Sequence, residues 1–496
     1  MSSSSLMLLE LWRWVVLREL LRPGRPGLPP GILLNAITPS LSISMISISG
    51  ATYFAFLSSF IFPFFKLIVI LYFDSKTNDS TVREANLGLY NSMYNCVDYS
   101  TFYPTFASKL IISDILMNTQ TTYLASKPHY EILDGLRGVA AVMVVAFHLL
   151  EAHSGGNHLA QIINHGYLAV DFFFMLSGFV IGYAYDDRWN RMSIGTFFKR
   201  RVIRLHPMVI MGSIIGALFF FLQKSPCFPN MDNVSVGTVL IIMLYGCTLL
   251  PLPLKWDIRG WTEMHPLNGP AWSLYYEYIG NILYALFVRK FNKVALSILV
   301  FLAACATLHL CLTAPNGDIV GGWALNWEQQ YVGFVRLLYP FFAGLLLSRL
   351  GWLIRVKKRA FWWCSLMIVI VLSVPRIGGE DGFWMNGLYE ALCIIFIFPV
   401  IVSMGAGGKV TGKRSVGICK FLGDISYPVY ITHYPLIYTY TAWACNHNAT
   451  ITEGLPYMIL TFVGAFVLAY ACLKLYDEPV RKWLTNRFLK GTRKAK

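Results

Sequence analysis

Residues 131–150 read EILDGLRGVAAVMVVAFHLL, and the interpretation of the whole chain depends on this stretch. It is apolar and long enough to cross a membrane, yet it contains Arg137 and His148. These two residues are eleven positions apart. At 3.6 residues per turn this is close to three turns, so both side chains share one helix face about 16 Å apart. Because an ionisable side chain in a lipid-embedded helix costs a few kcal/mol, this face is predicted to line a polar interior.

The composition of the whole chain indicates a membrane protein. Of its 496 residues, 56% are hydrophobic and only 14% are charged, whereas soluble globular proteins have roughly 25% charged residues. Continuously apolar runs of about 20 residues recur, which predicts an all-α polytopic membrane protein and disfavours a β-barrel. The net charge of +15 is attributed to cytoplasmic loops rich in Lys and Arg, so no nucleic-acid partner is predicted.

Eleven apolar segments come after residue 130, and the loops between them indicate how many cross the membrane. They lie roughly at 135–153, 166–185, 205–222, 234–250, 271–288, 294–313, 331–348, 360–375, 388–404, 425–444 and 455–475. The later loops are alternately rich in Lys and Arg and free of them, which predicts a cytoplasmic C-terminus. Three segments separate the basic loops at 188–204 and 289–293, so one of the three is predicted to be re-entrant or to lie flat. About ten transmembrane helices are therefore expected.

The first 116 residues do not match the rest of the chain. One interpretation is an appended helix with a flexible linker. The favoured one is that Met117 is the true start, so that residues 1–116 remain unassigned and are not part of the native protein. Residues 117–485 are then the membrane domain, and residues 486–496 form a basic cytoplasmic tail.

The ten cysteines are scattered and include no CxxC pair. Most lie inside apolar segments, so they are interpreted as small membrane hydrophobes, and neither a disulfide framework nor a metal site is predicted.

Four side chains are candidates for chemistry inside the membrane. His148 is suited to act as a general base, because a neutral imidazole accepts a proton from a hydroxyl near pH 7. Arg137 shares its helix face. Asp171 is expected to hold a first-helix cation or to orient His148, and Glu277 to pair with Arg137 or to orient His148. The alternative is structural: polar contacts between helices, a salt bridge, and a Gly178 that permits close packing.

A basic cluster begins the third segment, in the sequence FFKRRVIRLHP at residues 197–207. Arg201 and Arg204 are three residues apart and share a helix face, with Arg200 beside them. They are either ordinary cytoplasmic charge or a docking site for a phosphate-rich ligand, for which Arg offers bidentate hydrogen bonds. His433 and the DEPVRKWL stretch at 477–484 are weaker candidates.

Taken together, these stretches resemble the membrane-bound acyltransferase-3 family, whose members O-acylate bacterial cell-surface and other glycans. The resemblance covers roughly residues 130–485 and rests on six motifs in order. They are Arg137 with His148; Gly166, Val170, Phe173, Phe174, Ser177, Gly178 and Phe179, with one additional residue before the phenylalanine pair; Arg201 with Arg204; Trp272, Ser273, Leu274 and Glu277; the tyrosine-rich segment ending in His433; and Glu478, Pro479 and Arg481.

The resemblance implies an acyl-CoA donor, usually acetyl-CoA, used from the cytoplasmic side of the cell inner membrane. It also implies an acceptor hydroxyl on a glycan or another small molecule, with membrane lipid as the surroundings. The phosphates of CoA would dock at Arg200, Arg201 and Arg204. His148 would act as general base or relay the acyl group, with Arg137 positioning the donor. The alternative class is a transporter or flippase of a lipid-linked glycan.

Overall fold

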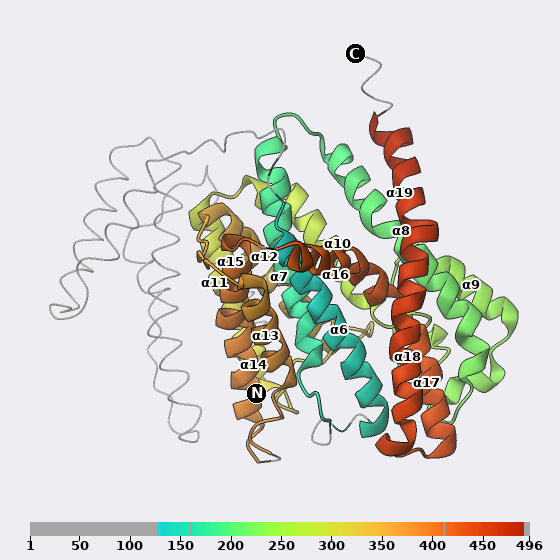
Figure 1. The fold of residues 1–496 in the computed structure, drawn as a ribbon. Coiled ribbons are helices and arrows are strands. Elements are labelled where there is room, and N and C mark those ends of the chain that lie inside the picture. Colours follow the sequence, from blue (N-terminus) through green and yellow to red (C-terminus); the bar gives the residue numbers. More distant parts are fainter. Residues whose placement is uncertain are drawn as a thin grey trace, which may run out of the picture. The chain divides into compact units, whose positions relative to one another are not determined.

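The computed structural model describes residues 127, 129–155, 157, 161–379, 381–410 and 412–490, apart from the side chain of Lys490. The predicted extension at 1–116 and the last six residues of the tail lie outside the described residues. In the described part every regular element is a helix, which confirms the all-α prediction (Figure 1). The longer helices are α6 (Glu131–Ser154), α7 (Ala169–Tyr185), α8 (Ile194–Phe220), α9 (Val236–Gly246), α10 (Ala271–Leu286), α11 (Lys293–Thr313), α12 (Trp327–Leu350), α13 (Ala360–Ser373), α14 (Phe383–Leu392), α15 (Phe398–Gly407), α16 (Lys413–Thr432), α17 (Tyr434–His447), α18 (Ile451–Cys472) and α19 (Glu478–Thr485).

Seven helical stretches of the described chain are long and apolar enough to cross a membrane. They are Glu131–Ser154, Gly166–Arg188, Ile194–Gln223, Lys293–Thr313, Trp327–Leu350, Phe383–Gly407 and Ile451–Leu489. The expected count of about ten is therefore not confirmed. Several predicted segments form shorter helices: α9 has 11 residues and α13 has 14. At 1.5 Å per residue, α9 reaches only about 16 Å across a hydrocarbon core of about 30 Å.

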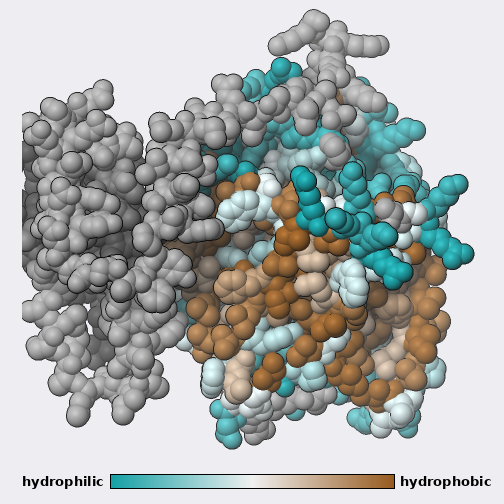
Figure 2. Space-filling view, turned by 60° about the vertical axis from the view of Figure 1, so that its left-hand side comes forward, coloured by the Kyte–Doolittle hydropathy of each residue, from teal (hydrophilic) through white to brown (hydrophobic). Residues whose placement is uncertain are grey.

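The surface of the described residues is typical of a protein surrounded by lipid. Figure 2 shows a broad hydrophobic band across the middle of one face, with hydrophilic residues gathered above it. Large apolar side chains in this part of the chain are extensively exposed, among them Leu460 and Val467 on α18. Exposed apolar area on this scale needs an apolar solvent.

Helices α7 and α12 pack at close range. A Cβ added at Gly178 would lie 1.7 Å from the backbone oxygen of Phe341, and one added at Gly344 would lie 2.0 Å from the backbone oxygen of Met175. Glycines on the two facing surfaces therefore let the backbones touch, as small residues commonly do between membrane helices. The structural interpretation of Gly178, that it permits close packing, is confirmed. Ser177, one residue earlier on α7, lies next to this contact.

The apolar segment predicted at 425–444 is not one helix. It divides at His433, where α16 ends and α17 begins, and Pro435 stands in the first turn of α17. Helix α16 packs along the length of α6. The break therefore places His433 beside the first helix instead of within a continuous span.

Candidate active site

Helix α6 contributes residues to the linings of two cavities. Arg137 lines a cavity of about 510 Å³, which also contains Arg204 and is called the Arg204 cavity. His148 lines a second cavity of about 530 Å³, called the His148 cavity. Val170 and Tyr430 line both. The two cavities therefore adjoin at these two side chains, with Arg137 and Arg204 on one side and the His148 imidazole on the other.

Arg137 finds its partner one turn earlier on its own helix. Its Nη1 lies 3.1 Å from Oδ1 of Asp134, and the other carboxylate oxygen lies 3.0 Å from Nε2 of His129. The expected pairing of Arg137 with Glu277 is wrong. The i,i+3 spacing on a helix already supplies a carboxylate, so no partner from another helix is needed.

His148 also pairs within α6, with a residue that was not among the sequence candidates. Its Nδ1 lies 2.7 Å from Oε2 of Glu151. An ionised carboxylate can only accept, so in the neutral imidazole Nδ1 carries the proton and Nε2 keeps a lone pair. The expectation that Asp171 or Glu277 orients this imidazole is wrong. The i,i+3 periodicity of the helix was the signal that could have identified Glu151.

His433 packs its ring against that of His148. The ring centroids are 5.6 Å apart and the planes are inclined by 29°. Nδ1 of His433 lies 3.0 Å from the Val429 carbonyl and 2.9 Å from the Tyr430 carbonyl. Since carbonyls only accept, Nδ1 donates, and Nε2 is a buried acceptor that has no hydrogen bond within the described chain. A weak sequence candidate thus becomes a direct neighbour of the proposed base.

Asp171 binds an arginine that was also absent from the sequence candidates. Its carboxylate lies 2.8 Å from Nη2 and 3.3 Å from Nε of Arg336, on α12. Both side chains are buried, and Arg336 lines the His148 cavity. An intramembrane arginine within the apolar run at 331–348 was the signal available. Asp171 therefore neutralises a cation from α12, not one from α6.

Glu277 belongs to the arginine cluster. Its Oε1 lies 2.6 Å from Nη2 of Arg201 and accepts a hydrogen bond of 2.9 Å from the Ser177 hydroxyl. All three side chains line the Arg204 cavity. The second expectation for Glu277, a contact with His148, fails because Glu277 lies in the other cavity. Glu277 instead fixes Arg201 and ties α8 to α7 through α10.

The Arg204 cavity contains charges of both signs, and most of its cations are paired. Arg201 is bound by Glu277, Arg137 by Asp134, and Arg481 by Asp477 at 2.7 Å. Arg204 lines the cavity, is exposed, and forms no ion pair among the residues that the structure describes. Arg200 is exposed but is not part of the lining. Arg204 is thus the lining arginine that remains available to an anionic ligand.

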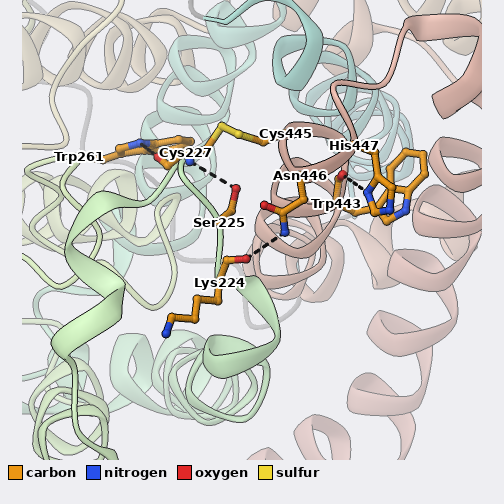
Figure 3. The surroundings of a disulfide bond; sticks show 8 residues. All are labelled: Lys224, Ser225, Cys227, Trp261, Trp443, Cys445, Asn446 and His447. Atoms are coloured by element: carbon orange, nitrogen blue, oxygen red, sulfur yellow. Dashed lines mark hydrogen bonds between the residues drawn. A yellow bond between two sulfur atoms is a disulfide. The ribbon is translucent and has the colours of Figure 1, made fainter.

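A disulfide lies beside the His148 cavity, contrary to the sequence interpretation of the cysteines. Cys227 is bonded to Cys445, 218 residues later (Figure 3). The indole N–H of Trp261 donates to the Cys227 carbonyl at 2.9 Å, and both residues line the cavity. Spacing along the chain gave no sign of the pair, because only the fold brings the turn at Cys227 next to the end of α17. The remaining described cysteines are free and are buried or half-buried, as expected for small hydrophobes.

The loop between α9 and α10 contributes a carboxylate to the same cavity. Glu263 is buried, and the Tyr438 hydroxyl donates to its Oε2 at 2.6 Å. Burial raises the pKa of Glu263 to about 7, although the positive charge of Arg259 opposes this rise. In the described part of the chain no group of side chains is arranged to hold a metal ion.

Comparisons with known proteins agree with the sequence resemblance. A family model described as an acyltransferase domain matches residues 130–470. Protein 2 in the picA locus of Rhizobium radiobacter is 34% identical over 161 residues, which cover 31% of this chain and 80% of that protein. Acyltransferase MdmB of Streptomyces mycarofaciens is 25% identical over 323 residues, or 62% of this chain and 78% of MdmB.

O-acetyltransferase OatA of Staphylococcus aureus (strain NCTC 8325 / PS 47) is 21% identical over 363 residues, which cover 71% of this chain but only 57% of OatA. No solved structure matches the chain. The family model spans well over half of the sequence and all of the helices that line the two cavities except η8 (Leu473–Asp477) and α19. This chain belongs to the membrane-bound acyltransferase-3 family and is a multi-pass membrane acyltransferase.

Proposed function

We propose that this protein is an O-acyltransferase that moves an acyl group, in the simplest case acetyl, from acyl-CoA to a hydroxyl of a glycan or another small molecule. The observation that carries the proposal is the adjoining pair of cavities, with Arg204 in one and His148 in the other. An anionic donor and a hydroxyl acceptor need such different surroundings. The printed names of MdmB and OatA, an acyltransferase and an O-acetyltransferase, point the same way.

The donor is proposed to bind in the Arg204 cavity. Its phosphates would contact Arg204, with Arg201 held in place by Glu277 and the exposed Arg200 extending the basic surface outside the cavity. Arg137, which lines the same cavity, would balance negative charge on the donor. The pantetheine arm would then carry the thioester towards Val170 and Tyr430, where the two cavities adjoin.

His148 is proposed to act as the general base. Its unprotonated Nε2 takes the proton of the acceptor hydroxyl while that oxygen attacks the thioester carbonyl. The new C–O ester bond forms, the C–S bond breaks, and the imidazolium returns the proton to the departing CoA thiolate. Glu151 holds the ring and stabilises the imidazolium. A relay through an acyl group on His148 would use the same residues. Asp171 and Glu277 are positioning residues, because each fixes an arginine.

The proposed location is the cell inner membrane, with the C-terminus in the cytoplasm. The basic start of α8 and the basic tail favour this orientation. The disulfide of Cys227 favours an oxidising compartment for the opposite end of α8. The donor would then enter from the cytoplasm, and the acceptor from outside.

The test is acyl transfer by the purified protein in detergent with radiolabelled acetyl-CoA. The wild-type protein is expected to release CoA and to acylate sugar acceptors or itself, which a flippase would not do. His148→Ala should lower the rate by about 100-fold or more, the range of general-base effects. His447→Ala, a change to an exposed histidine outside both cavities, is the matched control. Near wild-type transfer by His148→Ala at equal folded protein would exclude the proposed role.

A further inference from the structure

The charged side chains that line the His148 cavity differ in whether they are already paired within the protein. Among the described residues that line it, four have side chains that can be charged near neutral pH: His148, Glu151, Glu263 and Arg336. Arg336 directs four hydrogen bonds into the protein, to both carboxylate oxygens of Asp171 and to the backbone oxygens of Gly321 and Tyr167. Arg336, the single arginine that the described residues contribute to the lining, is therefore held by protein acceptors and is already neutralised.

The two carboxylates of the lining each keep an oxygen available. Glu151 uses Oε2 for His148, and Glu263 uses Oε2 for the Tyr438 hydroxyl. No hydrogen bond reaches Oε1 of either residue from the described part of the chain. Oε1 of Glu263 lies beside Gly269, where an added Cβ would approach it to 3.0 Å, so no protein side chain at 269 covers it.

A second arginine lies near Glu263 without reaching the cavity. The guanidinium carbon of Arg259 lies 3.6 Å from the centroid of the Tyr438 ring, and its Nη2 and Nε donate to Gln223 and to the Pro266 carbonyl. Arg259 is fully buried and is not part of the lining. It balances the charge of Glu263 from behind Tyr438 and presents no cation to a ligand.

The remaining walls of the cavity are largely aromatic. Trp261, Trp272 and Trp323 are among the lining residues. Flat indole faces pack well against the C–H faces of sugar rings, while carboxylate oxygens accept hydrogen bonds from hydroxyl or ammonium groups. Aromatic walls with a few convergent acceptors suit a polyhydroxylated ligand.

We infer that Glu263 is a specificity-determining residue, which makes the His148 cavity select polyhydroxylated acceptors without negative charge and reject those that carry a carboxylate. This inference rests on the proposed function, because it assigns the acceptor to this cavity. Its physical basis is electrostatic repulsion of anionic acceptors. An anionic acceptor would meet Glu263 and Glu151 in a cavity whose described lining offers no unpaired arginine or lysine, whereas a neutral or amino sugar would donate to them.

The experiment compares three ligands of equal ring size: methyl glucoside, methyl glucosaminide and methyl glucuronide. Binding to the full-length protein in detergent is followed by tryptophan fluorescence at pH 8.5, above the pKa of about 7 of Glu263, so that this carboxylate is ionised. Acyl transfer is followed at the same pH with radiolabelled acetyl-CoA. The wild-type protein should bind the glucuronide at least about tenfold more weakly than the other two, equivalent to about 1.4 kcal/mol. Glu263→Gln keeps the shape but removes the charge, and should bring the three affinities within about threefold of one another.

Glu328→Gln, a change at an exposed glutamate of the first turn of α12, is the matched control and should leave the order of affinities unchanged. Equal binding of the glucuronide by the wild-type protein, a preference that persists in Glu263→Gln, or no binding of any of the three sugars would each overturn the inference. A charge preference in binding without any acyl transfer would instead retain the role of Glu263 and count against the proposed function.

Discussion

At the scale of single residues, the charges near the two cavities are arranged in pairs that leave specific groups free. Glu277 fixes Arg201, and Glu151 fixes His148. These pairs hold the groups in place and lower the cost of ionisable side chains within the membrane. Arg204 differs, because no carboxylate binds it within the described chain. A free arginine in a lining of paired charges is the group that an anionic ligand would meet.

Replacement of Arg204 by Ala is therefore expected to weaken donor binding with little effect on the chemical step. A charge-assisted hydrogen bond contributes about 1.5–3 kcal/mol, so KM for acetyl-CoA should rise roughly 10- to 100-fold while kcat changes little. Steady-state kinetics with varied acetyl-CoA measure both. Lys290→Ala removes one exposed positive charge from the loop between α10 and α11 and should leave KM unchanged. An equal change in the two variants would mean that general surface charge, not Arg204, attracts the donor.

At the scale of helices, the contact between α7 and α12 sets the geometry of both cavities. Asp171 and Ser177 lie on α7 and Arg336 on α12, so the ion pair and the close glycine contact join the same two helices. The backbone of α12 touches α7 at Gly178. A side chain there would separate the helices and displace the carboxylate from its arginine.

Gly178→Ala is expected to destabilise the protein, because its new methyl group would overlap the Phe341 backbone oxygen. Overpacking of this kind costs about 1–3 kcal/mol, which should lower Tm in detergent by several degrees. Gly195→Ala makes the same chemical change near the start of α8, where the nearest atom is 4.0 Å away. The control should keep or slightly raise Tm, since alanine favours helix. An undiminished Tm in Gly178→Ala would show that α7 and α12 can separate freely.

At the scale of the whole molecule, two features indicate the orientation in the membrane: a disulfide and a basic tail. Cys227 comes after the C-terminal end of α8, and Cys445 lies near the C-terminal end of α17. The chain then returns through α18 to its basic tail. Because disulfides persist in oxidising compartments and basic segments stay in the cytoplasm, the two features predict one direction of insertion.

Labelling of intact cells with a membrane-impermeant maleimide tests this orientation. Cys227 and Cys445 should react only after brief treatment with an impermeant reductant, without permeabilisation. A cysteine introduced by Arg487→Cys near the tail should react only after permeabilisation. The Cys227→Ser, Cys445→Ser double variant controls for the seven free cysteines of the described chain. Labelling of the tail position in intact cells would reverse the proposed direction of donor entry.

The amino-acid sequence alone was enough to establish the class of the protein and the residues to consider. Its apolar runs require helices in a membrane, since only helices or closed barrels satisfy the backbone there, and its ordered motifs identify the family. The intramembrane ionisable residues Arg137, His148, Asp171 and Glu277 stand out because burial of charge in lipid is costly. That local physics needs no knowledge of the fold.

The partners of these residues, and the cavity that each one faces, depend on tertiary packing. The pairing of Asp171 with Arg336 and the bond between Cys227 and Cys445 join residues more than 150 positions apart, so no periodicity along the chain predicts them. The predicted number of spans is not confirmed, because hydropathy measures apolar content, whereas the break at His433 and the 11 residues of α9 depend on packing. The helix of Arg137 and His148 was recognisable from the sequence, but packing against α7, α16 and α17 determines that it lines two cavities instead of one.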